Sequence, residues 1–216
     1  MPIYPKHKVI FAHIPKTGGS TVTTMLKNDW VISHKKTSID KRGDGASTIS
    51  KMKKIVGNEV NDYFSFAFVR NPWDRLVSAY HYVSQRRPEI LEVASHRDFE
   101  SFLSAFYDNH EQMLKIRYFR PQWEYVCDQD GEICADFIGR FERFEADLKF
   151  VIQKLGLKRK IIRNRKRSRR DDYRLYYNDF GHEVVRQAYF RDISNFGYSF
   201  EDGQIRSRTP IFNRLR

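Results

Sequence analysis

The stretch HIPKTGGST, residues 13–21, directly follows the apolar run VIFA of residues 9–12, and together they decide the expected fold. An apolar run, a Gly-Gly turn and then hydroxyl residues predict a strand, a tight turn and a helix that begins near Ser20. Such a turn directs backbone N–H groups and the amino end of a helix at an anion, and Lys16 adds a positive charge. The stretch therefore predicts a phosphate-binding loop.

The place of Lys16 separates this loop from the phosphate loop of nucleotide hydrolases. In that loop the lysine follows the last glycine, whereas Lys16 precedes Gly18 by two residues. We therefore expect a phosphate-containing ligand and a reaction other than nucleotide hydrolysis.

Length and composition favour a globular protein. The chain has 216 residues, 40% of them hydrophobic, and no stretch reaches the roughly 18 apolar residues that cross a membrane. The first residues lack the apolar core of a secretory signal peptide. We expect one domain over residues 1–200, a polar basic tail over residues 201–216, and a soluble protein of the cytoplasm.

The charge predicts an anionic partner, because basic residues outnumber acidic ones by 39 to 27 and the formal net charge is +12. Nucleic acid, an acidic glycan, a membrane surface and a phosphorylated small molecule all fit this charge. Nine of the thirteen residues from Lys158 to Arg170 are Lys or Arg, and this run fits a solvated loop as well as a binding segment. It contains no aromatic residue, so we expect no specific binding of nucleic acid.

Two cysteines are too few for a disulfide framework or a zinc site, and we expect no metal ion. Cys127 and Cys134 flank Asp130-Gly131, a typical two-residue hairpin turn. Counting outward from this turn places the two cysteines opposite each other. A disulfide is compatible with that register, but reduced thiols suit a cytoplasmic protein better.

Apolar runs and helical patterns alternate along the chain. We expect strands over residues 8–13, 64–69 and 136–140, with a further short one over 30–33, and helices over 20–27, 48–56, 98–107, 110–119, 144–155 and 180–190, besides one that begins at Pro72. This alternation predicts an α/β fold of three layers, a P-loop-like parallel sheet flanked by helices. Ligands of such sheets bind at the carboxyl ends of the strands, where residues 13–21 fall.

A second motif, RNPWDRLVSAY over residues 70–80, follows the second buried strand. Arg70 leaves that strand at the same sheet edge as the first motif, and Ser78 lies on the next helix. A guanidinium and a hydroxyl that converge suit a phosphate monoester, so the two motifs predict a ligand with phosphoryl groups at two ends. The alternative is that Arg70 and Arg75 form ion pairs with Asp74 or bind the carboxyl end of a helix.

With these two motifs the chain closely resembles the sulfotransferases that use 3′-phosphoadenosine 5′-phosphosulfate (PAPS), and most of all the carbohydrate branch known as sulfotransferase family 2. Residues 13–20 are similar to its 5′-phosphosulfate loop, and residues 68–80 to its 3′-phosphate motif. Further similar stretches are residues 120–122, 136–142 and 189–200. The resemblance implies the sulfotransferase fold over nearly the whole chain.

The resemblance also implies roles for individual residues. Six residues would hold the 5′-phosphosulfate: Lys16, Thr17, Gly18, Gly19, Ser20 and Thr21. Arg70 and Ser78 would hold the 3′-phosphate, and arginines between Arg163 and Arg170 would reach the same donor. In sulfuryl transfer charge grows on the leaving phosphate, so we expect Lys16 to stabilise it. No metal is required, because sulfate carries less charge than a terminal phosphate.

The base that activates the acceptor hydroxyl is left open by the sequence. The relatives carry a His near the position of residues 45–48, where this chain has none. We name His34 as the candidate base, because it ends the expected strand over residues 30–33 and an ordinary His pKa of about 6.5 suits the role. Other candidates are His13, which fits bracing of the loop better, and the carboxylates Asp40, Asp44 and Glu59.

The resemblance implies a hydroxyl acceptor on a carbohydrate, and the positive charge favours an acidic glycan; a small metabolite or a lipid would also fit. Three tryptophans, Trp30, Trp73 and Trp123, suit sugar stacking as well as the core. Three other functions stay open: a P-loop-type nucleotide phosphotransferase, a nucleic-acid-binding module, and a catalytically weak PAPS-binding protein of the same fold. The oligomeric state is not predicted.

Overall fold

The computed structural model describes residues 3–26, 48–157, 171–201 and 210–212. Their contacts divide them into two units. The first, here the sheet unit, contains residues 3–26, 48–69, 122–157 and 210–212; the second, here the helical unit, contains residues 70–121 and 171–201. The single domain over residues 1–200 stays a prediction.

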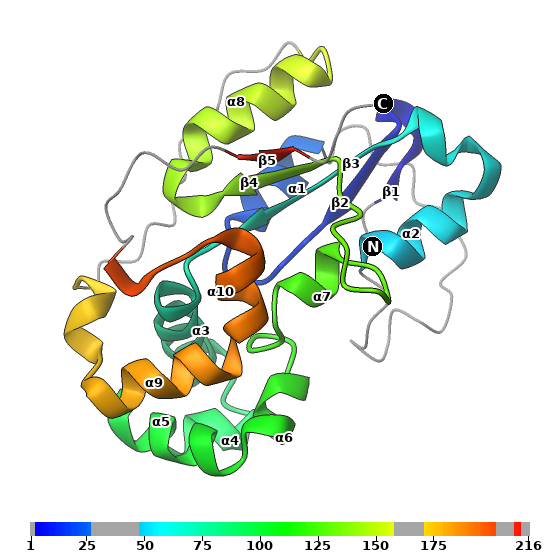
Figure 1. Ribbon diagram of the computed structural model, residues 1–216. Coiled ribbons are helices and arrows are strands. Elements are labelled where there is room, and N and C mark those ends of the chain that lie inside the picture. Colours follow the sequence, from blue (N-terminus) through cyan, green and yellow to red (C-terminus); the bar gives the residue numbers. More distant parts are fainter. Residues whose placement is uncertain (1–2, 27–47, 158–170, 202–209, 213–216) are drawn as a thin grey trace. The chain divides into compact units, whose positions relative to one another are not determined.

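The sheet unit contains a five-stranded sheet with the strands in chain order (Figure 1). The strands are β1 (Ile3–Tyr4), β2 (Val9–Ala12), β3 (Phe64–Val69), β4 (Phe137–Arg140) and β5 (Ile211–Phe212). The central strands β2, β3 and β4 are parallel, as predicted, while β1 and β5 pair antiparallel at the two edges. β1 is antiparallel because only a short turn joins it to β2.

Residues 211–212 belong to the expected polar tail, yet they form the edge strand β5. The reason is apolar contact: the ring of Phe212 lies 5.3 Å from that of Phe137 and 5.2 Å from that of Phe150. Burying such rings stabilises an edge pairing that the polar sequence around it does not predict.

Helices cover both faces of the sheet. The unit contains α1 (Gly19–Leu26), α2 (Ile49–Val56), α7 (Trp123–Val126) and α8 (Phe144–Lys154), with short 3-10 helices η1 (Pro5–His7), η4 (Gly57–Asp62) and η5 (Phe141–Arg143). Phe66 and Phe137 pack with α1 and α8 on one face. The neighbouring Ser65 points to the other face, where its hydroxyl donates to Asp136 at 2.6 Å. Asp136 pairs with Lys53 of α2 at 3.7 Å, so the three-layer α/β arrangement is confirmed (Figure 1).

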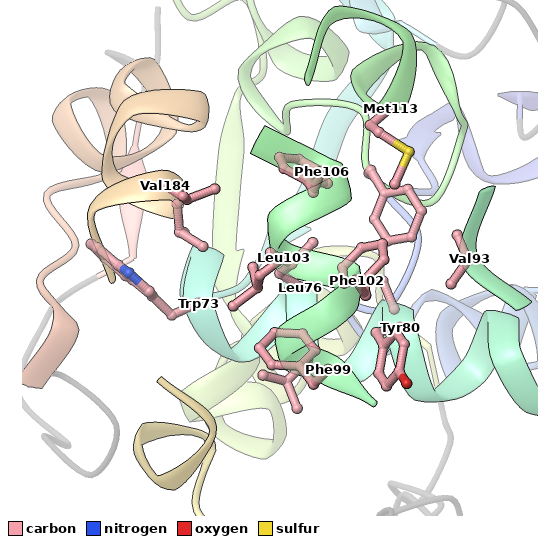
Figure 2. Packing of buried hydrophobic residues seen from close by; sticks show 14 of the residues in the cluster. Trp73, Leu76, Tyr80, Val93, Phe99, Phe102, Leu103, Phe106, Met113 and Val184 are labelled. Carbon is pink, nitrogen blue, oxygen red and sulfur yellow. The ribbon is translucent and has the colours of Figure 1, made fainter. Parts of the chain in front are cut away.

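The helical unit is built around α3 and holds a large aromatic core (Figure 2). Its helices are α3 (Pro72–Arg86), α4 (Leu91–Ala94), α5 (Phe99–Asp108), α6 (His110–Lys115), η6 (Tyr173–Tyr176), α9 (Asp179–Ala188) and α10 (Phe190–Phe196). Figure 2 shows Leu76 and Tyr80 of α3 beside Phe99 and Phe102 of α5. This core places α3, and with it the second motif, within a rigid packed unit.

Two of the predicted helices end earlier than expected. The helix expected over residues 110–119 stops at Lys115, and the buried Arg75 binds the carbonyls of Tyr118 (3.3 Å) and Arg120 (2.8 Å) instead. The helix expected over residues 180–190 stops at Ala188. The next residue, Tyr189, is buried, and its hydroxyl donates to the carbonyl of Phe119 at 2.7 Å. Both breaks come from contacts between segments distant in sequence.

The predicted cysteine register is wrong by one residue, because Cys127 lies opposite Ile133 and not opposite Cys134. The side chain of Asp128 accepts the N–H groups of Asp130 and Glu132, both at 3.0 Å, which widens the turn. Neither cysteine forms a disulfide, and burial raises the pKa of the Cys134 thiol.

Candidate functional site

The loop after β2 adopts an unusual backbone conformation at the carboxyl edge of the sheet. Lys16 has a φ of +70° and Gly18 a φ of +85°. The first is costly for a residue with a side chain, about 1–3 kcal/mol, and such strain persists only where neighbours hold it. Thr17, between them, is 1% exposed and donates its hydroxyl to the carbonyl of Ile14 at 2.9 Å. The loop therefore presents Lys16 from a fixed, strained turn.

Gly18 and Gly19 leave no room for a side chain. A Cβ on Gly18 would lie 2.6 Å from the ring of Phe144, the first residue of α8, and a Cβ on Gly19 would collide with the ring of His13. The two rings hold the backbone of the turn at the point where α1 begins. The first N–H groups of a helix have no acceptor within the helix, so those of Gly19 and Ser20 suit an anion.

Ser20 and Thr21 differ in what they can contribute. Ser20 is exposed on the first turn of α1. Thr21 is partly buried, and its N–H donates to the carbonyl of Gly18 at 3.0 Å. Thr21 therefore helps to close the turn through its backbone.

His13 braces this loop. Its ring contacts Gly19, stacks on Phe11 with centroids 5.9 Å apart, and places Nδ1 3.5 Å from the hydroxyl oxygen of Thr23. The same hydroxyl donates to the carbonyl of Gly19 at 2.9 Å. These contacts match the bracing role that the sequence favoured for His13 over a role as base.

A buried arginine that the sequence analysis did not single out lies at the same edge of the sheet. Arg140 ends β4, pairs in register with Val69 of β3, and is 6% exposed. The backbone N–H of Arg140 donates to the carboxylate of Asp147 of α8 at 2.8 Å, and the Arg143 guanidinium lies 3.6 Å from the same carboxylate. Burial raises the pKa of Asp147, and the charges of the two arginines oppose that rise. Arg140 could have been identified from the sequence, because it is a charged residue at the end of a buried strand.

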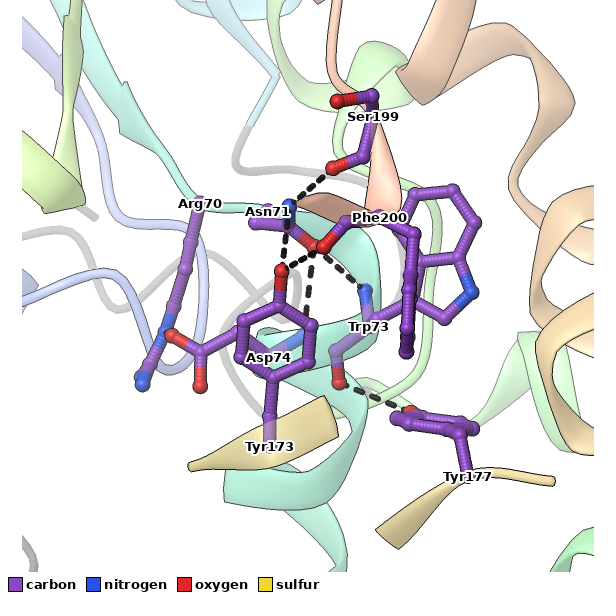
Figure 3. A network of polar contacts seen from close by, with 8 residues as sticks. All are labelled: Arg70, Asn71, Trp73, Asp74, Tyr173, Tyr177, Ser199 and Phe200. Carbon is purple, nitrogen blue, oxygen red and sulfur yellow. Dashed lines mark hydrogen bonds and ion pairs between the residues drawn. The ribbon is translucent and has the colours of Figure 1, made fainter. Parts of the chain in front are cut away.

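The second motif forms a cap at the start of α3 in the helical unit (Figure 3). The side-chain oxygen of Asn71 accepts the N–H of Trp73 at 3.1 Å, and its amide donates to the carbonyl of Ser199 at 2.8 Å and to the hydroxyl of Tyr173 at 3.4 Å. The hydroxyl of Tyr173 donates in turn to the carbonyl of Phe200. Asn71 therefore ties the turn that carries Arg70 to residues more than a hundred positions later, a role that the sequence alone did not reveal.

Arg70 pairs with Asp74, as the alternative interpretation expected. Its Nε donates to the Asp74 carboxylate at 2.6 Å, and the arginine is 6% exposed (Figure 3). A guanidinium carries five N–H donors, so a bond through Nε orients the group without using all of its donors. Ser78 is 7% exposed and lies one helical turn after Asp74. Phosphate binding by Arg70 and Ser78 stays a prediction.

Arg75 has a structural role. It is 2% exposed, and it binds the carbonyls of Tyr118 and Arg120 described above. Trp73 is likewise a core residue, 2% exposed, with its ring stacked on His182 at 5.3 Å. Phosphate binding thus remains the prediction for Arg70, whereas Arg75 acts in the structure.

The remaining predicted site residues divide into two groups. The first group lies outside the described residues: the candidate base His34, the carboxylates Asp40 and Asp44, Trp30, and the basic run over residues 158–170. Glu59 is described, and the structure corrects its proposed role as base. It precedes β3 and bonds Lys8, which precedes β2, at 2.6 Å, so it lies at the amino edge of the sheet, opposite the loop.

A sequence model of the sulfotransferase family matches residues 1–199. The chain belongs to the sulfotransferase family. Both motifs and most of each described unit fall within the matched residues, so the match includes the loop after β2 as well as the Arg70 turn.

Individual relatives of this sulfotransferase-family chain are distant. It is 26% identical over 191 residues to human carbohydrate sulfotransferase 9, covering 72% of this chain and 41% of that protein. It is 24% identical over 178 residues to carbohydrate sulfotransferase 14 of Danio rerio, covering 70% and 47%. An uncharacterized protein of Archaeoglobus fulgidus is 28% identical over 124 residues, 57% of this chain and 93% of that protein. No solved structure gives a significant match.

The chain spans less than half the length of the human and fish relatives. Within the part that the structure describes, no helix is long and apolar enough to cross a membrane, and no three His, Cys, Asp or Glu side chains form a group that could hold a metal ion. The cytoplasmic location and the independence from metal stay predictions.

Proposed function

We propose that the protein is a PAPS-dependent sulfotransferase that transfers a sulfuryl group to a hydroxyl of a carbohydrate. The observation that carries this proposal is the strained turn at Lys16, closed by two glycines at the start of α1, in a chain of the sulfotransferase family. The names of the two carbohydrate sulfotransferase relatives support the choice of acceptor.

The residues present fit such a donor. The backbone of the glycine turn is held between the rings of His13 and Phe144, and the amino end of α1 favours a negative charge there. We propose that residues 16–21 bind the 5′ end of the donor in this way. Arg70, oriented by Asp74, and Ser78 would bind its 3′-phosphate.

PAPS supplies an activated sulfuryl group attached to a phosphate leaving group. The task of Lys16 is then to neutralise the charge that develops on that phosphate, with help from the backbone N–H groups at the start of α1. The strained φ of Lys16 fits this role, because it fixes the direction of the side chain before the ligand arrives. His34 remains our candidate base for the acceptor hydroxyl.

The test is binding of adenosine 3′,5′-bisphosphate, the product that PAPS leaves behind. A ligand that binds only the folded protein at 100 times its Kd adds about 2.7 kcal/mol to the free energy of unfolding, so the melting temperature should rise by several degrees. Adenosine 5′-monophosphate, which lacks the 3′-phosphate, should give a clearly smaller rise. No shift at millimolar bisphosphate would contradict the proposal, and so would a shift that requires Mg²⁺, as expected of a nucleotide phosphotransferase.

A further inference from the structure

The turn that carries Arg70 leads into α3, and the residues that hold it belong to the helical unit. Asn71 follows Arg70 and precedes Pro72, the first residue of α3. A residue before a proline avoids helical backbone angles, so Asn71 stays outside the helix, with a φ of −46° and a ψ of 124°. From this position its side chain caps the first turn of α3. Arg70 is therefore adjacent in the chain to the residue that fixes the start of the helix.

Asn71 is also connected to the Arg70 guanidinium through Asp74. The side-chain oxygen of Asn71 accepts the backbone N–H of Asp74 at 3.5 Å. The Asp74 carboxylate accepts in turn from Nε of Arg70 at 2.6 Å. The side chains of Arg70 and Asp74 are only 8% and 16% exposed, so water and salt screen their attraction less than that of a surface pair. A shift of Asn71 would therefore move the carboxylate that orients the guanidinium.

The amide nitrogen of Asn71 anchors the turn on its other side (Figure 3). It donates to the carbonyl of Ser199 at 2.8 Å and to the hydroxyl of Tyr173 at 3.4 Å. The Tyr173 ring packs edge-on against Phe200, with the ring centres 5.6 Å apart, and its hydroxyl donates to the Phe200 carbonyl. Asn71 is 0% and Tyr173 5% exposed. Because a buried carbonyl that loses its donor is costly, this anchor resists displacement.

We propose that Asn71 is a positioning residue for the 3′-phosphate of the donor. It is fully buried and acts through Asp74, which directs the Arg70 guanidinium. A guanidinium binds phosphate through two parallel N–H bonds only when its plane has the right direction, and a misplacement of about 1 Å can cost about 100-fold. This inference rests on the proposed function, because Arg70 has to meet the 3′-phosphate. It adds that the preference for a 3′-phosphorylated nucleotide depends on the anchor at Tyr173 and Ser199.

Another asparagine of the helical unit shows what a cap does without this connection. Asn178 caps α9, where its side-chain oxygen accepts the N–H of Gly181 at 2.8 Å and its amide donates to Glu100 at 3.3 Å. Asn178 is an exposed residue, and α9 carries none of the residues that we propose to bind the donor. Asn178 is therefore the matched control for Asn71, with the same residue type at the same helix position.

The test is calorimetric titration of the full chain with adenosine 3′,5′-bisphosphate and, in parallel, with adenosine 5′-monophosphate. Asn71→Ser keeps a hydroxyl that can cap α3 but loses the amide that donates to Ser199. It should raise the Kd of the bisphosphate about tenfold and that of the monophosphate less than about twofold. Tyr173→Phe keeps the ring and loses only the hydroxyl, so the Kd of the bisphosphate should rise about threefold. Asn178→Ser should change either Kd by less than about twofold.

Melting temperatures of the same variants separate positioning from support of the fold. If Asn71→Ser melts earlier but binds both nucleotides as the wild type does, or loses affinity for both equally, Asn71 is structural and the inference is overturned. If Asn71→Ser does not fold, Tyr173→Phe decides, and an unchanged bisphosphate Kd in that variant overturns the inference. A wild type that binds the two nucleotides equally would contradict the proposed function itself. A wild type that prefers the bisphosphate, with the same preference in Asn71→Ser, would contradict this inference alone.

Discussion

The ring of His13 lies directly against the backbone of Gly19, so that a Cβ at residue 19 would collide with the ring. A single histidine at the end of β2 thus sets the position of the first residue of α1. The geometry of the proposed anion site therefore depends on a contact within the sheet unit, between two residues that the sequence places only six positions apart.

Gly19→Ala should disturb this contact and cost about 1–3 kcal/mol of unfolding free energy, because extra atoms in a packed site force neighbours to shift. Urea unfolding measures the loss. His13→Ala in the same chain removes the collision, so the double variant should lose less than the sum of the two single variants. If the loss of unfolding free energy in the double variant equals the sum of the two single losses, the two residues are not in contact.

Lys16→Ala should lower sulfate transfer at least about 100-fold while leaving the fold intact, because a preorganised charge next to the leaving group is lost. Lys16→Gly is the matched variant. It removes the same charge but relieves the positive φ, so it should be about 1 kcal/mol more stable than Lys16→Ala and equally inactive. Turnover near that of the wild type in either variant would remove Lys16 from the mechanism.

Arg70→Lys keeps the charge but loses the planar fork, so it should weaken binding of adenosine 3′,5′-bisphosphate about tenfold. Binding of adenosine 5′-monophosphate should hardly change, since it has no 3′-phosphate. Calorimetric titration of both nucleotides checks this. Equal losses for both would mean that Arg70, through its pair with Asp74, only supports the fold.

His34→Ala should lower turnover at least about tenfold and change the acidic limb of the pH–rate profile if His34 is the base. His110→Ala is the control, because His110 is an exposed residue at the start of α6. An unchanged profile in His34→Ala would direct the search to Asp40 and Asp44, since the structure places Glu59 at the other edge of the sheet.

The buried Asp147 should make stability depend on pH. Its folded pKa lies above the ordinary value of 3.8, so the folded state binds the proton more tightly than the unfolded state. The contribution of this tighter proton binding to the free energy of unfolding is fully present below pH 3.8. It is lost as the pH rises through the folded pKa of Asp147. The stability of the wild type relative to Asp147→Asn, which cannot ionise, should therefore fall with rising pH in urea unfolding. A constant difference from pH 3 to 7 would contradict this assignment.

The sequence predicted well those features that depend on neighbouring residues. The helices expected over residues 48–56 and 144–155 are present as α2 and α8, with each boundary within one residue. The Thr48 side chain caps α2 by accepting the N–H of Lys51 at 3.3 Å, and Gly156 has a φ of +61° just after α8. Each signal involves only a few neighbouring residues: a hydroxyl residue caps the start of a helix, and a glycine follows its end. The parallel order of the three central strands followed from the same local patterns.

Features that depend on distant partners could not be predicted. Asn71 acts through the carbonyl of Ser199, and Arg75 ends α6 through carbonyls more than forty residues away. No local pattern shows which carbonyl a buried polar group will bind. The predicted pairing of Cys127 with Cys134 was wrong for a local reason, because the side chain of Asp128 accepts two backbone N–H groups within the turn.

Transfer of radiolabelled sulfate from PAPS to a panel of glycans tests the central claim most directly. The account predicts labelled product with at least one acidic, incompletely sulfated glycan, released bisphosphate in equal amount, and neither product with Lys16→Ala. A wild-type protein that binds the bisphosphate but labels no glycan, or that labels one as well without Lys16, would contradict it.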